Sequence, residues 1–194
     1  LSENDISVLN TEYLNHDVSS VIRHAIGMDY YSILSLKIIA TLTFSQQKTL
    51  LLVEDRYSLY KATSRLKAIF GDQIQTYQDF DQFKTNIVLI VTVQDLIELL
   101  KKTDFIQLNL GLFVIEECAI LGNSFNVTDV SIEPMFALLS FLDKFPTITM
   151  LVFTSKVQNI QEVSEWIENI TNNFCLPILL ESKPARQAKG IVGY

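Results

Sequence analysis

The sequence predicts an α/β domain in which a mostly parallel β-sheet is covered by helices on both faces. Short runs made almost entirely of apolar residues recur along the chain, as is typical of strands buried on both sides of a parallel sheet. These runs alternate with segments of 11 to 16 residues whose apolar residues repeat at helical spacing. Such alternation is the pattern of βαβ units and of a three-layer domain.

The composition supports one ordered domain. The chain has 194 residues, of which 48% are hydrophobic and 19% are charged. This length is enough for a single domain with a substantial core. The mean hydropathy of +0.25 is high for a free-standing domain. Either a large core or apolar surface that is covered by something outside the chain explains that value.

The first half of the chain begins the alternation. Residues 21–26 predict a short strand, and the apolar spacing from Tyr31 onwards predicts a helix. Residues 48–55, "KTLLLVED", are a continuous apolar run that ends on acids, which predicts a buried strand. Residues 56–71 repeat apolar residues at helical spacing and end on Gly71, a typical C-cap.

The remaining segments repeat the same two patterns. The predicted strands are 73–77, 86–92, 110–116, 147–155 and 175–181. The predicted helices are 93–103, 131–145 and 159–174. We therefore predict a polar N-terminal segment (1–18), one α/β domain (19–181) and a polar tail or linker (182–194).

Charge and targeting signals limit the functions open to this chain. The net charge of −7 argues against strong binding of a phosphate backbone by the isolated domain. We expect no membrane association, because no apolar run reaches the ~18 residues that a spanning helix needs. The polar start "LSENDISVLN" is no signal peptide, and Cys118 and Cys175 lie in apolar contexts. We expect reduced thiols in a nuclear or cytoplasmic protein, and a chain that starts at Leu1 rather than Met is expected to be part of a longer one.

Polar residues follow the apolar runs where a ligand would be expected. In parallel sheets, ligands gather at the carboxyl ends of the strands. The predicted strand ends carry polar pairs or single polar residues, namely Glu54-Asp55, Thr92, Glu116-Glu117 and Thr154-Ser155. A nucleotide site would have this appearance, so the first strand-to-helix loop becomes decisive.

That loop lacks the chemistry of a phosphate-binding loop. A P-loop, G-x-x-x-x-G-K-[ST], needs glycines for close backbone approach, a lysine for the outer phosphates and a hydroxyl for Mg²⁺. The segment "IGMDYYS" has one glycine, Gly27, and the next lysine is Lys37, inside the predicted helix. Tyr30 and Tyr31 stand where small residues are needed and would crowd a phosphate. We therefore predict a chain that is not an enzyme of the P-loop type.

Taken together, these segments resemble the first RecA-like domain of superfamily 2 helicases, in the branch that contains Dicer, the RIG-I-like receptors and the FANCM/XPF group. There, a strand such as "LLVFDEC-H" carries the Mg²⁺-binding Asp and the water-activating Glu. This chain has "LFVIEECA", with Glu116 in place of the Asp, Glu117 and Cys118 retained, and Ala119 in place of the His. Lengthening Asp to Glu moves the carboxylate by about an ångström, which octahedral Mg²⁺ tolerates poorly.

Two further segments carry the resemblance, which spans about residues 20 to 181. "LVFTSK" offers Thr154 and Ser155 for the motif that couples nucleotide state to nucleic acid in the family. "VLIVTVQDLIELL" resembles the strand and helix that carry a nucleic-acid-contacting threonine, here Thr92. Lys61, Arg65 and Lys67 form a modest basic patch that is either a further nucleic-acid contact or a solvated helix face.

The resemblance and its departures imply a vestigial nucleotide site, with no catalytic residue, metal or cofactor. Its expected members are Gly27, Tyr30, Tyr31, Glu116, Glu117, Thr154 and Ser155. We expect the two glutamates to be solvated. We also expect part of the segment that contains Ile26, Met28, Tyr30 and Tyr31 to fold over the strand ends and fill the site, above all a tyrosine whose hydroxyl bonds to a polar group there.

The first functional hypothesis is an inactive helicase-like domain. It would serve as a structural or partner-docking module of a larger nucleic-acid-processing protein, either Dicer-like in RNA silencing or XPF/FANCM-like in DNA repair or meiotic recombination. Its partners would be other domains of that protein, or another protein over apolar surface, with weak or no direct nucleic-acid binding. The alternative is a metal- or nucleotide-dependent enzyme that uses Glu116 and Glu117 with Asp55. An XPF-type nuclease fold is a third hypothesis, but "EEC" lacks the basic residue of that class.

Overall fold

The computed structural model describes residues 13–15, 17–77, 86–116 and 132–180. The predictions made for Glu117, Cys118 and Ala119 therefore lie outside the described residues. So do the polar segments predicted at the two ends of the chain, apart from a few residues that precede the first strand.

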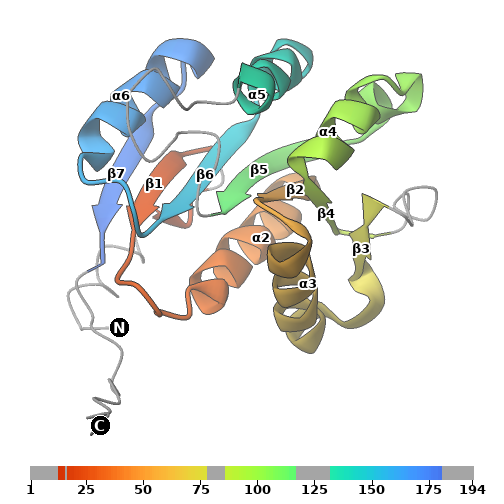
Figure 1. The fold of residues 1–194 in the computed structure, drawn as a ribbon, viewed down its shortest axis with the longest axis horizontal. Coiled ribbons are helices and arrows are strands. Elements are labelled where there is room, and N and C mark those ends of the chain that lie inside the picture. The colour runs from red at the N-terminus through yellow and green to blue at the C-terminus, as the bar shows by residue number, and fades with distance from the viewer. Residues whose placement is uncertain (1–12, 16, 78–85, 117–131, 181–194) are drawn as a thin grey trace, which may run out of the picture.

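A parallel β-sheet forms the centre of the molecule (Figure 1). In the described residues it has seven strands in the order β3-β4-β2-β5-β6-β1-β7, and each neighbouring pair is parallel. The strands are β1 (Ser19–Arg23), β2 (Lys48–Val53), β3 (Ile74–Thr76), β4 (Val88–Thr92), β5 (Leu110–Glu116), β6 (Thr149–Thr154) and β7 (Cys175–Leu179).

Helices cover both faces of this sheet. Figure 1 shows α2 and α3 on one face and α4, α5 and α6 on the other. The helices in the described residues are α2 (Tyr31–Ser45), α3 (Arg56–Phe70), α4 (Val93–Leu100), α5 (Ile132–Lys144) and α6 (Ile160–Thr171), with short 3₁₀ turns η2 (Gly71–Gln73) and η4 (Thr103–Gln107). The predicted three-layer α/β class is confirmed. No helix in the described part of the chain is long and apolar enough to cross a membrane.

Two apolar cores explain why the strands are continuously apolar in sequence. Along β2, Leu50 and Leu52 pack into the core under α4, α5 and α6, whereas Leu51 and Val53 pack into the core under α2 and α3. Successive side chains of a strand point to opposite faces, so a strand covered on both sides must be apolar at every position. Cys175 is also buried, and burial raises the pKa of its thiol to about 11, as expected for a structural cysteine.

Capping residues set several boundaries that apolar runs alone predicted less well. The strand predicted at 48–55 ends at Val53, because Asp55 caps α3 by accepting a hydrogen bond from the Ser58 N–H at 2.7 Å. Gly71 ends α3 with a φ of 61°, as predicted. The strand predicted at 21–26 lies instead at Ser19–Arg23, so Ile26 belongs to the loop that follows.

Candidate functional site

The polar strand ends meet at one edge of the sheet. Because all the strands are parallel, the ends of β5 and β6 lie beside the loop that leaves β1. β6 pairs with both β5 and β1, and Glu116 stands in register with Phe153. This edge therefore gathers Glu116, Thr154 and the residues that connect β1 to α2.

The loop from β1 to α2 makes one tight turn before the helix begins. Gly27 has a φ of 84°, a conformation that favours glycine. The carboxylate of Asp29 accepts a hydrogen bond from the Tyr31 N–H at 3.3 Å, so an acidic side chain of the protein lies at the start of the helix. In a P-loop, lysine and serine or threonine open this helix and the N-terminal N–H groups hold phosphate. Here Tyr30 and Tyr31 occupy those positions.

Both tyrosines turn inward onto the end of β5. The hydroxyl of Tyr31 donates to Glu116 Oε1 at 2.7 Å, and the hydroxyl of Tyr30 donates to the same oxygen. The exposed fractions of Tyr30, Tyr31 and Glu116 are 2%, 3% and 4%. Burial, together with the charge of Glu116, raises the pKa of the Tyr31 hydroxyl well above its ordinary value. The expected contact between a tyrosine hydroxyl and a polar strand end is confirmed.

Aromatic stacking holds Tyr30 in this position. Its ring stacks on Tyr31 at a centroid distance of 5.0 Å and on Phe153 of β6 at 4.6 Å. The ring of His24, the first residue of the loop, lies 4.6 Å from the Tyr30 ring, and His24 is itself buried. Stacked and tilted aromatic pairs add to the energy of burial. The ring cluster consequently fills the space between the β1–α2 loop and the carboxyl edge.

One expectation about this edge is wrong. Glu116 is not solvated, because the tyrosine side chains cover it and take up one of its oxygens. Ile26 does not fill the site, since 82% of its side chain is exposed. Met28 does pack against the core under α2 and α3. A tyrosine hydroxyl can donate a hydrogen bond to a buried carboxylate, whereas an aliphatic side chain cannot. This difference explains which residues turn inward.

Charged side chains surround the two tyrosines. Arg65 of α3 pairs with Asp29 at 3.6 Å, and the ammonium of Lys61 lies 5.8 Å from the centre of the Tyr31 ring. At the neighbouring strand ends, Lys156, which lies after β6, is 3.9 Å from Glu54, which follows β2. β2 and β6 flank β5, so this pair joins the segments that follow the strands on either side of Glu116. The basic groups here are directed at the protein's own carboxylates and rings.

The remaining strand-end residues have structural partners. Thr154 is 1% exposed, and its hydroxyl accepts hydrogen bonds from the N–H groups of Lys156 and Val157, both at 3.2 Å. Thr92 and Asp95 form a reciprocal capping box at the start of α4. Arg56 reaches the same Asp95 at 3.1 Å.

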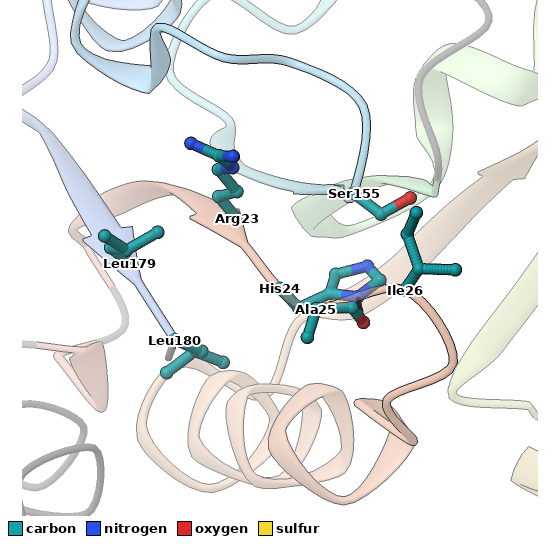
Figure 2. Close-up of a pocket in the computed structure, with 7 residues that line it drawn as sticks. All are labelled: Arg23, His24, Ala25, Ile26, Ser155, Leu179 and Leu180. Atoms are coloured by element: carbon teal, nitrogen blue, oxygen red, sulfur yellow. Dashed lines mark hydrogen bonds between the residues drawn. The ribbon is translucent and has the colours of Figure 1, made fainter. Parts of the chain in front are cut away.

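An open hollow lies beside the tyrosine cluster (Figure 2). Its volume is about 410 Å³, and its walls are Arg23, His24, Ala25, Ile26, Ser155, Leu179 and Leu180. Figure 2 shows His24, Ile26 and Ser155 together on one side, and on the other Leu179, which ends β7, and Leu180, which follows it. Ser155 therefore faces this hollow between β1, β6 and β7, whereas Glu116 lies under the tyrosines.

Lys37, the first lysine after the loop, forms hydrogen bonds with the segment that precedes β1. It is fully buried, and its ammonium donates to the carbonyls of Tyr13, Asn15 and Val18 at 2.8, 2.6 and 2.9 Å. Burial lowers the pKa of Lys37 to about 8. The Tyr13 hydroxyl in turn donates to the Ile33 carbonyl of α2 at 2.9 Å. Lys37 thus fastens the segment before β1 onto α2.

The predicted site residues therefore fall into groups. Gly27, Tyr30, Tyr31 and Glu116 form one connected unit, and Thr154 is adjacent through its carbonyl, which accepts from the His24 N–H. Among the candidate nucleic-acid contacts, Lys61 and Arg65 lie at the loop, Thr92 lies in its capping box, and Lys67 is exposed. In the described residues, no group of three or more His, Cys, Asp or Glu side chains could hold a metal ion.

Asp29 and Phe153 are parts of this unit that sequence reasoning missed. Asp29 precedes the first helical residue by two positions, and its bond to the Tyr31 N–H is that of an Asx turn, for which aspartate is a common residue. Phe153 was assigned to an apolar strand without a role, and no sequence pattern distinguishes the face of a buried strand that will stack on a distant tyrosine.

Solved helicase structures share this architecture. The chain superposes on the DUF1998 helicase MrfA bound to DNA and AMPPNP with a TM-score of 0.67 at 15% identity, over 92% of this chain and 27% of that one. It superposes on the DEAD-box helicase Mss116 bound to ssRNA and UDP-BeF with a TM-score of 0.67 at 16% identity, over 92% and 40% of the two chains. It superposes on the UvsW helicase of bacteriophage T4 with a TM-score of 0.62 at 11% identity, over 92% of this chain and 60% of that one.

The domain has the RecA-like fold of helicases. At these identities the likeness is one of fold, and the chain spans between 27% and 60% of the length of these three helicases. No protein-family model matches the sequence, and no curated protein matches it. The tyrosine cluster thus lies on a RecA-like domain, at the loop where this class of fold places the phosphate-binding turn.

Proposed function

We propose that this chain is a catalytically inactive helicase-like domain that acts as a structural or partner-docking module of a larger nucleic-acid-processing protein. One observation carries the proposal: both residues that open α2 are tyrosines, and both bond to Glu116, the strand-end carboxylate nearest the loop. A triphosphate at this loop would have to displace two buried aromatic side chains, at a cost of roughly 1.5–3 kcal/mol for each.

Electrostatics support the same proposal. Phosphate needs positive charge and unoccupied N–H groups. Here Asp29 accepts the Tyr31 N–H, and Glu116 lies under the tyrosines. Arg65 is paired with Asp29, and Lys37 is bonded to three backbone carbonyls of the segment before β1. Arg65 and Lys37 are therefore already bonded to oxygen atoms of the protein itself.

For the parent protein we propose the two classes that the sequence suggests, acting in the nucleus or cytoplasm. A Dicer-like protein of RNA silencing would carry PAZ and RNase III patterns after a second RecA-like domain. An XPF/FANCM-like protein of DNA repair or meiotic recombination would carry a nuclease-like domain and helix-hairpin-helix patterns. The sequence of the parent protein beyond this domain decides between them.

Calorimetric titration with ATP and Mg²⁺ tests the proposed inactivity. We expect no binding up to about 1 mM nucleotide, which corresponds to less than about 4 kcal/mol of binding free energy. An active helicase titrated under the same conditions serves as the positive control. ATP hydrolysis should equal the rate without protein, with or without nucleic acid.

The alternative, an enzyme that uses Glu116 and Glu117, makes the opposite prediction. Mg²⁺-dependent ATP binding tighter than about 1 mM would contradict our proposal, provided that Glu116→Gln abolishes it and Glu54→Gln does not. Glu54 is a suitable control because it also follows a strand at this edge, but 47% of its side chain is exposed.

A further inference from the structure

The outward face of α2 carries no charge. Ser32, Leu36, Ile39 and Thr43 recur at the spacing i, i+4, i+7 and i+11 and are all exposed, which makes them one stripe along the helix. The exposed fractions of Leu36 and Ile39 are 48% and 45%. Lys37 is the one charged residue of this helix, and it is fully buried. A helix that faces water normally presents a polar face, so this stripe is suited to contact with another protein surface.

The neighbouring helix has the opposite character. α3 carries four basic residues, Arg56, Lys61, Arg65 and Lys67, and no acidic residue, in a chain of net charge −7. The contacts of Lys61 with Tyr31 and of Arg65 with Asp29 put these two basic groups on the side of α3 that borders α2. Tyr57 of the same helix is 75% exposed. Figure 1 shows α2 and α3 side by side on one face of the sheet.

We propose that the α2–α3 face, defined by Leu36, Ile39, Tyr57, Lys61 and Arg65, docks an amphipathic helix of a partner protein. The partner's apolar stripe would lie on Leu36 and Ile39, and its acidic edge would lie over α3. Two adjacent helices leave a groove that a third helix can enter at an axial separation of about 8–10 Å. The inference rests on the proposed docking role, but it does not depend on whether the nucleotide site is closed.

The charge-free stripe favours a protein over a nucleic acid as the occupant. Leu36 and Ile39 offer a phosphate backbone no donor, whereas they suit the apolar anchors of a helix placed in a groove. The basic residues of α3 would then select acidic partners and increase the rate of association. Arg65 keeps Asp29 as an intramolecular partner, so we expect Lys61 to provide most of this selectivity.

Two synthetic peptides serve as probes. Both are helical, about 18 residues long, and carry leucines at the spacing i, i+3, i+4 and i+7. One has glutamates on both flanks of the leucine stripe, and the other has lysines there. Fluorescence anisotropy of each labelled peptide is followed during titration with the full 194-residue chain. We expect the glutamate peptide to bind at least about tenfold more tightly than the lysine peptide, and this ratio to shrink as salt rises.

Matched variants locate the binding face. Leu36→Glu combined with Ile39→Glu should lower the affinity for the glutamate peptide at least about tenfold. Lys61→Glu should reduce the difference in affinity between the two peptides. The control is Leu139→Glu, because Leu139 of α5 is 47% exposed on the opposite side of the sheet. Circular dichroism and melting temperature confirm that each variant is folded.

Several results would overturn the proposal. Equal affinities for the two peptides would show that the face does not select acidic partners. An equal loss of affinity in the Leu139→Glu control would show that the peptide does not bind at the α2–α3 face. If neither peptide binds at about 1 mM, the face is not a docking site for such a helix. Sedimentation would test a second copy as the occupant: self-association that Leu36→Glu abolishes would show that the face pairs with itself. None of these results bears on ATP binding, so failure here and failure of the proposed inactivity are distinguishable.

Discussion

Glu116 is the residue on which the site depends. It is a buried carboxylate at the end of β5, and it accepts hydrogen bonds from Tyr30 and Tyr31, which approach from a loop 86 and 85 residues earlier in the chain. A buried charge is costly unless its partners remain in place. The tyrosines and the glutamate therefore stabilise one another, and the loss of Glu116 removes the acceptor that the two hydroxyls share.

Glu116→Gln should lower the free energy of unfolding by about 1–3 kcal/mol, because the amide cannot replace a charged acceptor of two hydroxyls. Urea denaturation followed by circular dichroism measures the change. Glu54→Gln, at an exposed position of the same edge, should change the stability by less than about 0.5 kcal/mol. Equal effects of the two substitutions would show that the tyrosine contacts contribute nothing to the fold.

Tyr31 should make stability depend on alkaline pH. Burial and the charge of Glu116 raise the pKa of its hydroxyl, so the folded state holds this proton at pH values where the unfolded chain, with a tyrosine pKa of about 10, releases it. Its contribution is complete below about pH 10 and is lost as the pH rises above 10, at up to about 1.4 kcal/mol per pH unit.

Urea denaturation between pH 8 and 11, expressed as wild type minus Tyr31→Phe, isolates this effect. The phenylalanine variant should lose less stability above pH 10 than the wild type. Tyr57→Phe is the control, because Tyr57 is 75% exposed and its replacement should leave the pH dependence unchanged. Parallel pH profiles for the wild type and Tyr31→Phe would contradict the prediction.

At the scale of elements, the connection from β1 to α2 carries the specific features of this domain. The strand before it and the helix after it were visible in the sequence as an apolar run and a helical repeat. The sequence predicts that part of this segment, above all a tyrosine, turns inward, but it does not predict that Ile26 stays exposed. The local sequence pattern indicates that a loop exists. Which of its side chains enters the core depends on the partner that another strand provides, here the carboxylate of Glu116.

Replacement of residues 27–34 by G-x-x-x-x-G-K-T should destabilise the domain and restore little ATP binding. The graft removes Tyr30 and Tyr31 and so leaves a cavity beside Glu116, which we expect to cost a few kcal/mol, as other large-to-small changes in cores do. Thermal unfolding and calorimetric titration with ATP measure the two effects. A stable graft that binds ATP below about 1 mM would show that the rest of the site is intact and that only the loop is altered.

At the scale of the whole molecule, the charge distribution limits what the domain can bind by itself. The chain carries 22 acidic and 15 basic residues, and four of the basic residues belong to α3. Lys61 and Arg65 of that helix already contact the β1–α2 loop, and Arg56 contacts Asp95. The acidic residues outnumber the basic ones, and their charge opposes the approach of a phosphate backbone.

Binding of single-stranded or double-stranded nucleic acid should accordingly be weaker than roughly 10 µM at physiological salt, and it should weaken further as salt rises. Anisotropy titration with labelled DNA and RNA at two salt concentrations measures it. Lys67→Glu, at an exposed position of α3, should reduce whatever binding remains. A nanomolar complex whose affinity does not fall with salt would contradict the prediction. It would indicate a nucleic-acid site that the net charge of the chain does not reveal.

The sequence by itself determined the three-layer α/β class, most of the order of strands and helices, and the absence of a P-loop. It could do so because a strand covered on both faces must be apolar at every position, and because phosphate binding needs particular residues close together in the chain. Only the tertiary structure decided that Glu116 is buried, that Tyr30 and Tyr31 share its oxygen, and that Lys37 lies inside the fold. These contacts join segments separated by between 19 and 86 residues, and their energies depend on geometry that local sequence patterns do not contain.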